Sequence, residues 1–268
     1  KGGIWLVDTT TGVQQPLVSD ASQPRWSPDG KRLAYIASDN GRPQLFVRWI
    51  DTGQEAQLTS GPELPLGAMW SPDGSQIVFG MTVPDEVEPF ATMPAKPEGA
   101  DWGKAPNTIR RLIYRRDGDG YLERKRNHLY VFDVETKKLD TLTIGDFEEA
   151  NPIWSPDSKK IAFVSNRTAD PDRNGNSDLW VMDARKGAPL KQLTTWEDSD
   201  NNPAWSPDGK WIAYLKSQTP GYDMYDQPQV AVIPTDGGTP KILNATSDRD
   251  VAAPRWSADS KSVMVTVE

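Results

Sequence analysis

One pentapeptide, Trp-Ser-Pro-Asp-Gly, returns along the chain and constrains its fold more than any other feature. Five copies are present, the last of them degraded, and they begin at Trp26, Trp70, Trp154, Trp205 and Trp256. Successive copies are 44, 84, 51 and 51 residues apart. A repeat of about 40–50 residues that contains four short strands is typical of a β-propeller, in which blades surround a central channel. We therefore predict an all-β protein whose blades are four-stranded antiparallel sheets.

The chemistry of the pentapeptide predicts a tight turn between two strands. Proline presets φ at the first turn position, aspartate tolerates the second, and glycine adopts the left-handed third position without steric cost. Ser158 and Ser260 replace this glycine, so a slight strain is expected in their turns. The tryptophan lies on the incoming strand, and its large apolar area predicts a packing role between neighbouring sheets. We therefore expect none of these tryptophans to be a functional residue.

Apolar strands separated by turn residues fill the intervals between the copies. We predict a single propeller domain over residues 1–268, with about five blades' worth of repeats. The expected units are a half blade 1–19, blades 20–60, 61–145, 146–196 and 197–246, and a half blade 247–268. Two arrangements remain open. Either the strands of 3–18 and 253–267 pair and close a five-bladed ring, or the chain is a piece of a longer propeller.

The interval of 84 residues contains a long insertion, residues 82–127, between the expected second and third strands of one blade. No motif turn occurs inside it, so we interpret it as an insertion in one blade rather than as a lost blade. A loop of this length without repeat strands is usually functional or mobile. We expect it to be the most protease-sensitive stretch of the chain, because it lacks the packing of the blades.

Composition excludes several classes of function. The chain has 268 residues, a formal net charge of −8 and a sequence pI of about 4.9, which argues against general nucleic-acid binding. It contains no cysteine, so disulfides, thiol catalysis and cysteine-bound zinc are excluded. No apolar run is long enough to span a bilayer, and we expect no membrane partner. The absence of cysteine leaves the compartment open, and we favour the cytoplasm over the periplasm.

Each repeat has a longer signature beyond the pentapeptide. It continues with Lys-x-Ile-Ala-Phe/Tyr-x-Ser, then Asp-Leu-Trp-Val-x-Asp, then Gln-Leu-Thr. This unit resembles the blade repeat shared by TolB and the prolyl oligopeptidase family of serine peptidases, and the resemblance covers essentially the whole chain. The segments 110–122, 128–131 and 165–181 are similar to the acylaminoacyl-peptidase branch of that family. The insertion is the discriminating part, since the blade repeat is shared more widely.

This resemblance implies a non-catalytic propeller, of about seven blades in those enzymes, that caps an α/β-hydrolase domain and restricts access to short peptides. The chain contains no Gly-x-Ser-x-Gly nucleophile motif, and its only histidine is His128 at the start of an expected strand. We therefore expect the chain alone to be catalytically inert and His128 to have a structural role. Its expected partners are a hydrolase domain of the same parent serine peptidase and peptide substrates.

Two other functions stay open at this point. One is a TolB-like scaffold propeller that binds proteins through its rim or central channel. The other is a propeller enzyme such as a lyase or lactonase, which needs several histidine or carboxylate ligands and is disfavoured by a single histidine. The long basic insertion favours the peptidase interpretation over the scaffold, since a plain scaffold has no evident need for it.

The segment 170–178 is a candidate metal loop. Oxygen-bearing side chains alternate along it, with a glycine at the sixth position, in the way that loops wrap a hard cation. The twelfth position is Val181 instead of the bidentate glutamate of an EF-hand, and the alternative is a hydrophilic turn. Calcium is the one cofactor that we consider, and its candidate ligands are Asp170, Asp172, Asn174, Asn176 and Asp178.

The insertion is locally basic although the protein as a whole is acidic. Seven arginines and lysines between residues 110 and 126 accompany three acidic residues. Such a cluster suits an anionic partner, for example a substrate carboxylate held by a bidentate arginine. The alternative is a solvated loop that pairs its own charges or docks on a hydrolase domain. We predict substrate contact through Arg115, Arg116 and Tyr121.

Overall fold

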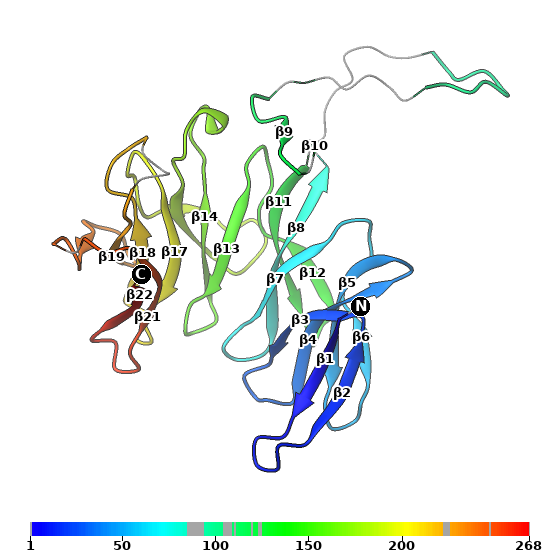
Figure 1. Cartoon of the computed structure of the whole chain (residues 1–268), viewed down its shortest axis with the longest axis horizontal. Coiled ribbons are helices and arrows are strands. Elements are labelled where there is room, and N and C mark those ends of the chain that lie inside the picture. Colours follow the sequence, from blue (N-terminus) through cyan, green and yellow to red (C-terminus); the bar gives the residue numbers. More distant parts are fainter. Residues whose placement is uncertain are drawn as a thin grey trace.

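The computed structural model describes residues 2–84, 94–103, 109, 111–118, 120–122, 125–221, 226–246 and 248–267. Strands dominate these residues, and the only helix among them is a short 3-10 turn, η1 (Pro171–Arg173) (Figure 1). None of the described segments forms a helix with the length and apolarity that a membrane span needs. The all-β prediction is confirmed. The protease sensitivity expected of the insertion concerns a stretch that lies in part outside the described residues, so it stays a prediction.

Four antiparallel sheets of four strands each form the body of the molecule (Figure 1). The first contains β3 (Ala21–Trp26), β4 (Arg32–Asp39), β5 (Arg42–Trp49) and β6 (Glu55–Gln57). The second contains β7 (Pro65–Trp70), β8 (Gln76–Pro84), β11 (Lys125–Asp133) and β12 (Lys138–Thr141). The third contains β13 (Glu149–Trp154), β14 (Lys160–Ser165), β15 (Asp178–Asp183) and β16 (Lys191–Gln192). The fourth contains β17 (Asp200–Trp205), β18 (Trp211–Lys216), β19 (Gln229–Pro234) and β20 (Lys241–Ile242). The prediction of four-stranded antiparallel blades is confirmed.

Two further hairpins flank the four sheets. β1 (Gly3–Val7) pairs with β2 (Gln14–Ser19), and β21 (Val251–Trp256) pairs with β22 (Val263–Val267). Each hairpin is a separate two-stranded sheet, and the two lie at opposite ends of the array of sheets (Figure 1). The pairing of 3–18 with 253–267, which would close a five-bladed ring, is therefore wrong for this structure. The reason is geometric, because the array of four sheets does not turn far enough to bring its outer hairpins together.

The motif turns share one hydrogen-bond pattern. In the first copy the Ser27 hydroxyl donates to Asp29 Oδ1 (2.5 Å), and the N–H of Gly30 donates to the Ser27 carbonyl (2.9 Å). The same two bonds recur in the other four copies. Gly30 has a φ of 67°, and the replacing residues Ser158 and Ser260 have φ of 61° and 59°. Both serines thus hold the left-handed conformation that carries the expected strain.

The motif tryptophans link neighbouring sheets. In three copies the indole N–H donates to a carbonyl of the preceding sheet, one residue before that sheet's own motif tryptophan. These pairs are Trp70 with Arg25 (3.0 Å), Trp154 with Met69 (3.1 Å) and Trp256 with Ala204 (2.9 Å). Trp70 and Trp154 are also buried in apolar clusters between sheets. The packing role predicted for these two tryptophans is confirmed.

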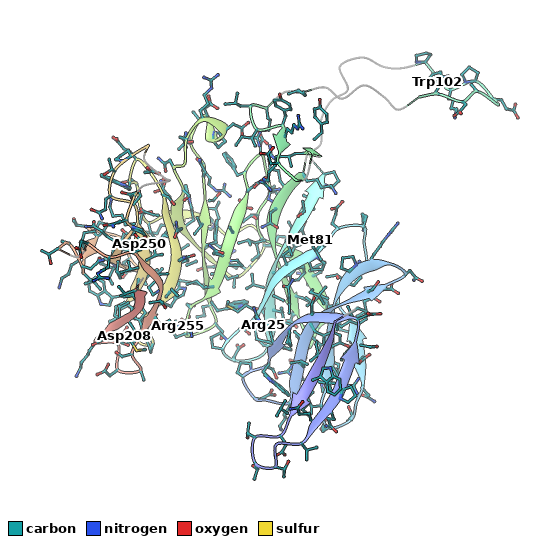
Figure 2. The ribbon with its side chains drawn as sticks, in the orientation of Figure 1. Arg25, Met81, Trp102, Asp208, Asp250 and Arg255 are labelled. Atoms are coloured by element: carbon teal, nitrogen blue, oxygen red, sulfur yellow. The ribbon has the colours of Figure 1, made fainter. Side chains whose placement is uncertain are left out.

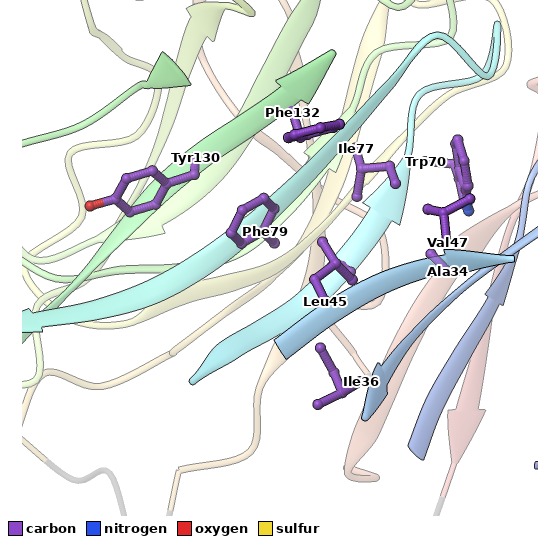
Figure 3. Close-up of a cluster of buried hydrophobic side chains, with 10 residues drawn as sticks. Ala34, Ile36, Leu45, Val47, Trp70, Ile77, Phe79, Tyr130 and Phe132 are labelled. Atoms are coloured by element: carbon purple, nitrogen blue, oxygen red, sulfur yellow. The ribbon is translucent and has the colours of Figure 1, made fainter. Parts of the chain in front are cut away.

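Apolar side chains fill the space between neighbouring sheets. In the cluster between the first two sheets, Leu45 and Val47 of β5 lie near Ile77 and Phe79 of β8 (Figure 3). The side chains of this cluster are almost fully shielded from solvent, which stabilises the contact by about 25 cal/mol for each Å² removed from water. Similar clusters join the second sheet to the third and the third to the fourth.

Candidate functional site

The longest strand pair carries the insertion beyond the end of the blades. β8 and β11 pair over nine residues, whereas β14 and β15 of the next sheet pair over six. Within the insertion, β9 (Arg115–Arg116) pairs with β10 (Gly120–Tyr121) as a small hairpin above this pair (Figure 1). Arg115 lies directly opposite Tyr121, and Arg116 is adjacent. The structure thus brings the three residues predicted to contact substrate onto one exposed hairpin.

The hairpin combines cationic and apolar groups. Its two tyrosine rings, Tyr114 and Tyr121, stack with centroids 6.2 Å apart, although Tyr121 as a residue stays 62% exposed. Leu112 and Ile113 are exposed beside them. We call this set the hairpin surface, and it consists of Leu112, Ile113, Tyr114, Arg115, Arg116 and Tyr121. Aromatic residues and arginine next to exposed aliphatic side chains are the composition of recognition surfaces.

The base of the hairpin is fixed to the third sheet by ion pairs. Arg111 Nε lies 3.4 Å from Asp172 Oδ2, and another nitrogen of Arg111 lies 3.5 Å from Asp146. The N–H of Leu112 also donates to Asp172 Oδ2 (3.1 Å). Asp172 lies in the loop between β14 and β15, so the insertion of the second sheet is anchored on a loop of the third.

A buried charge network also joins the second sheet to the third, and its centre is Glu149. The Glu149 side chain is 0% exposed, and its Oε1 accepts a hydrogen bond from the Arg167 guanidinium. Its other oxygen accepts the Thr143 hydroxyl (2.6 Å) and contacts His128 Nδ1 (3.0 Å). Arg167 also lies over the ring of Trp180 at 5.3 Å. His128, the only histidine, is therefore held in a buried structural contact, as predicted.

Sequence reasoning missed this network because its members come from separate loops and strands. Glu149 begins β13, and in the register of the third sheet it lies beside Ser165, which lies beside Asp178. A repeated pattern could have signalled it. The same three positions of the next repeat also carry hydrogen-bonding side chains: Asp178, Thr194 and Asp200 stand where His128, Thr143 and Glu149 stand. In both repeats the threonine hydroxyl accepts a hydrogen bond from a backbone N–H in the third strand of its own sheet, β11 or β15.

The structure places the five candidate calcium ligands in several different contacts. Asp170 pairs with Arg173, and Asp172 pairs with Arg111. Asn174 contacts Asn166 and Thr168, and its side-chain oxygen accepts the N–H of Asn176. The Asp178 carboxylate accepts hydrogen bonds from the Gln192 amide (2.8 Å) and the Thr194 hydroxyl (3.1 Å). Burial raises the pKa of Asp178 to about 6. In the part of the chain that the structure describes, no three acidic or histidine side chains are grouped as metal ligands. Calcium binding here stays a prediction.

Calcium should raise the melting temperature if the 170–178 loop binds it. The expected stabilisation is about 2.7 kcal/mol at a free calcium concentration one hundred times the dissociation constant, because the ion binds only the folded state. Thermal unfolding in calcium and in chelator measures this, and Asp172→Asn, which removes a carboxylate from the loop, should lose the difference. Superimposable melting curves in calcium and chelator would remove the calcium hypothesis.

Comparison with protein families identifies this array of blades. Residues 120–268 match the model of the PD40 family, the TolB beta propeller domain. The chain belongs to this TolB propeller family. The match begins at the hairpin strand β10 and includes the third and fourth sheets. The predicted resemblance of the repeat to TolB is thereby confirmed.

The curated relatives of this TolB-type propeller include peptidases. It is 29% identical over 183 residues to the uncharacterized peptidase YuxL of Bacillus subtilis, covering 67% of this chain and 27% of that protein. It is 25% identical over 257 residues to dipeptidyl-peptidase 5 of Porphyromonas gingivalis, covering 91% and 37%. The structure of an acylaminoacyl peptidase from Pyrococcus horikoshii is similar with a TM-score of 0.70 at 18% identity, covering 98% and 38%. The chain thus spans only 27–38% of the length of these proteins.

Proposed function

We propose that this TolB-type propeller is the non-catalytic part of a serine peptidase and that its hairpin surface selects peptide substrates for a hydrolase domain. The observation that carries the proposal is the hairpin itself, which presents Arg115 opposite Tyr121 and is fixed at its base to a neighbouring sheet. The matches cover only 27% and 37% of the two peptidase relatives, which supports a partner domain in the same parent protein.

The pair Arg115 and Tyr121 suits the end of a peptide. Residues directly opposite each other in an antiparallel pair share one face, so the guanidinium and the phenol ring are available to the same ligand. A guanidinium donates two parallel hydrogen bonds to a carboxylate, while an aromatic ring packs against an apolar side chain. A short peptide with a free carboxylate and an apolar last residue fits this combination.

Hydrolysis is assigned to the partner domain. A serine nucleophile needs a neighbouring base, and the only histidine of this chain contacts the buried Glu149 instead. The role of the propeller is then to admit and orient peptides, and the chemistry of the scissile bond lies with the hydrolase.

Binding of short labelled peptides to this chain tests the proposal. We expect a peptide with a free carboxylate to bind at least tenfold more tightly than its amidated form, since one charge-assisted bond contributes roughly 1.5–3 kcal/mol. Arg115→Ala should remove that preference. Arg255→Ala, an exposed arginine on the outer hairpin β21–β22, is the matched control and should keep it (Figure 2). Equal affinity of the two peptide forms for the unchanged chain would contradict the proposal.

A TolB-like scaffold is the second candidate, and the apolar half of the hairpin surface favours it. Three exposed residues of the hairpin surface, Leu112, Ile113 and Tyr114, have no role in binding a peptide carboxylate. Exposed apolar and aromatic side chains of this kind anchor protein–protein contacts. Binding of a folded partner that is lost in Leu112→Ser/Ile113→Ser but unchanged in Arg115→Ala, with no peptide binding, would favour the scaffold.

A further inference from the structure

A pocket of about 370 Å³ opens between the third and fourth sheets, among the motif turns. The motif turn of each sheet supplies one wall, as residues 155–157 and 207–209 both line it. The residues that matter here are Asp157, Lys160, Trp205, Asp208, Gly209 and Thr235. These turns lie at the end of the blades away from the insertion, where Figure 2 labels Asp208. The pocket is therefore separate from the hairpin surface.

The equivalent position between the first and second sheets is filled by an arginine. The Arg32 guanidinium lies over the Trp70 ring at 4.8 Å and donates to the Gly74 carbonyl (2.9 Å). It also pairs with Asp29 of its own turn (3.4 Å). The Arg32 side chain is only 18% exposed, so it closes this interface from within.

The two interfaces correspond residue by residue. Trp205 and Gly209 stand where Trp70 and Gly74 stand, and Asp157 stands where Asp29 stands. The backbones correspond as well. A Cβ at Gly74 would lie 3.6 Å from the Cδ of the motif proline across the interface, and one at Gly209 would lie 3.9 Å from its counterpart. The aromatic face, the carbonyl and the carboxylate that hold a guanidinium in the first interface are thus all present in the pocket.

Only the guanidinium is missing, because Lys160 replaces Arg32. Lys160 directs its ammonium group to Asp183 (3.1 Å), and its side chain is 51% exposed. A lysine is a point charge on a flexible chain, and it lacks the planar group that stacks on an indole while donating sideways. Trp205 also differs from the three tryptophans that link neighbouring sheets, since its buried indole N–H has no acceptor among the described residues.

The charges of the pocket suit a cation. Hydrogen bonds from the Ser155 and Ser206 hydroxyls hold the pKa of Asp157 and Asp208 below the usual value, so both are ionised at neutral pH. The ammonium of Lys160 pairs with Asp183, and that of Lys210 lies 3.8 Å from Asp208, so Asp157 is the pocket carboxylate that takes part in neither ion pair. The Gly209 carbonyl accepts a hydrogen bond from the Thr235 hydroxyl (3.2 Å), and its second lone pair can accept another donor.

We propose that this pocket binds an arginine side chain of a partner polypeptide, with the guanidinium stacked on Trp205 and donating to the Gly209 carbonyl and Asp157. Cation–π contact with tryptophan and paired donation to oxygen both favour a guanidinium over an ammonium. A neutral urea group of the same shape lacks the positive charge that the Asp157 carboxylate attracts. The pocket should therefore prefer arginine to both lysine and citrulline.

A titration followed by NMR tests the proposal with N-acetyl-arginine amide, N-acetyl-lysine amide and N-acetyl-citrulline amide as probes. The indole N–H signal of Trp205, assigned from Trp205→Phe, should shift with arginine and at least tenfold less with the other two. Lys160→Arg should fill the pocket from within, as Arg32 fills its counterpart, and should weaken the arginine response at least tenfold. Lys159→Arg adds the same group one residue away, on an exposed side chain, and should leave the response unchanged.

The reciprocal change gives a second test that does not depend on the first variant. Arg32→Lys should open the equivalent pocket and make the Trp70 signal respond to arginine, which it should not do in the unchanged chain. An equal response to lysine and arginine would overturn the proposal, and so would a Trp205 response that survives Lys160→Arg. No response of Trp205 to arginine at any concentration would overturn it as well.

Discussion

Replacing Glu149 with alanine is expected to lower the free energy of unfolding by about 3–5 kcal/mol, because it removes one partner of a buried charge network. Glu149 is fully buried and accepts hydrogen bonds from Arg167 and Thr143 while contacting His128. Without it, the Arg167 guanidinium keeps its aromatic neighbours but loses its carboxylate. Urea unfolding of the variant and of the unchanged chain measures the difference.

Two further variants separate the charge from the packing. Glu149→Gln keeps an acceptor for Thr143 but not the charge, so its loss of stability should lie between those of the unchanged chain and Glu149→Ala. Glu148→Ala removes the neighbouring carboxylate, which is 65% exposed and 3.6 Å from Arg126, and should change stability by less than about 0.5 kcal/mol. Equal losses for Glu148→Ala and Glu149→Ala would show that the buried network does not stabilise the fold.

Replacing Asp200 with asparagine is expected to stabilise the protein at pH 8 and to have little effect near pH 4. Asp200 is 0% exposed, and neither carboxylate oxygen has a hydrogen-bond partner among the described residues. Burial raises its pKa to about 7, and the positive charge of Lys216 opposes this shift only in part. Burial likewise raises the pKa of the neighbouring Asp178 to about 6.

The sign of the pH dependence follows from which state binds the proton. Below about pH 4 both the folded and the unfolded chain hold it, so Asp200 costs no stability through ionisation. Between about pH 4 and 7 the unfolded chain releases the proton first, so stability falls as the pH rises. Three pKa units correspond to about 4 kcal/mol, which is the upper bound of the penalty above pH 7 that Asp200→Asn removes.

Urea unfolding at pH 5 and pH 8 measures this effect. The unchanged chain should lose stability between the two conditions, and Asp200→Asn should lose clearly less. Asp248→Asn, at an aspartate whose side chain is 96% exposed, is the matched control and should behave like the unchanged chain. A stability of Asp200→Asn that falls with pH as steeply as that of the unchanged chain would contradict the assignment.

The strands and turns could be predicted from the sequence because their causes are local. The pentapeptide determines its own turn, and Ser158 takes the left-handed conformation that the pattern required. The failure of the ends to pair could not be predicted. It depends on the angle between neighbouring sheets, and side chains packed across the interfaces set that angle.

The sites were predicted only where neighbours in the sequence are also neighbours in space. Arg115 and Tyr121 lie within one short hairpin, so their proximity could be read from the chain. The contact of Glu149 with Arg167 and the reach of Arg32 to Gly74 join different loops or sheets. The sequence alone shows that Lys160 occupies the repeat position of Arg32. The consequence of this difference follows only from the structure, in which Arg32 fills the interface between the first two sheets. Trp205, which we expected to be a packing residue, acquires a proposed binding role for that reason.

The register of the third sheet makes the two stability predictions interdependent. Glu149, Ser165 and Asp178 lie side by side across β13, β14 and β15, and Asp178 in turn raises the pKa of Asp200. Removal of Glu149 leaves Arg167 as an uncompensated positive charge near this row, and such a charge favours the ionised form of the aspartates. A double-mutant cycle of Glu149→Ala and Asp200→Asn should therefore yield a non-zero coupling energy, so that neither substitution measures an isolated residue.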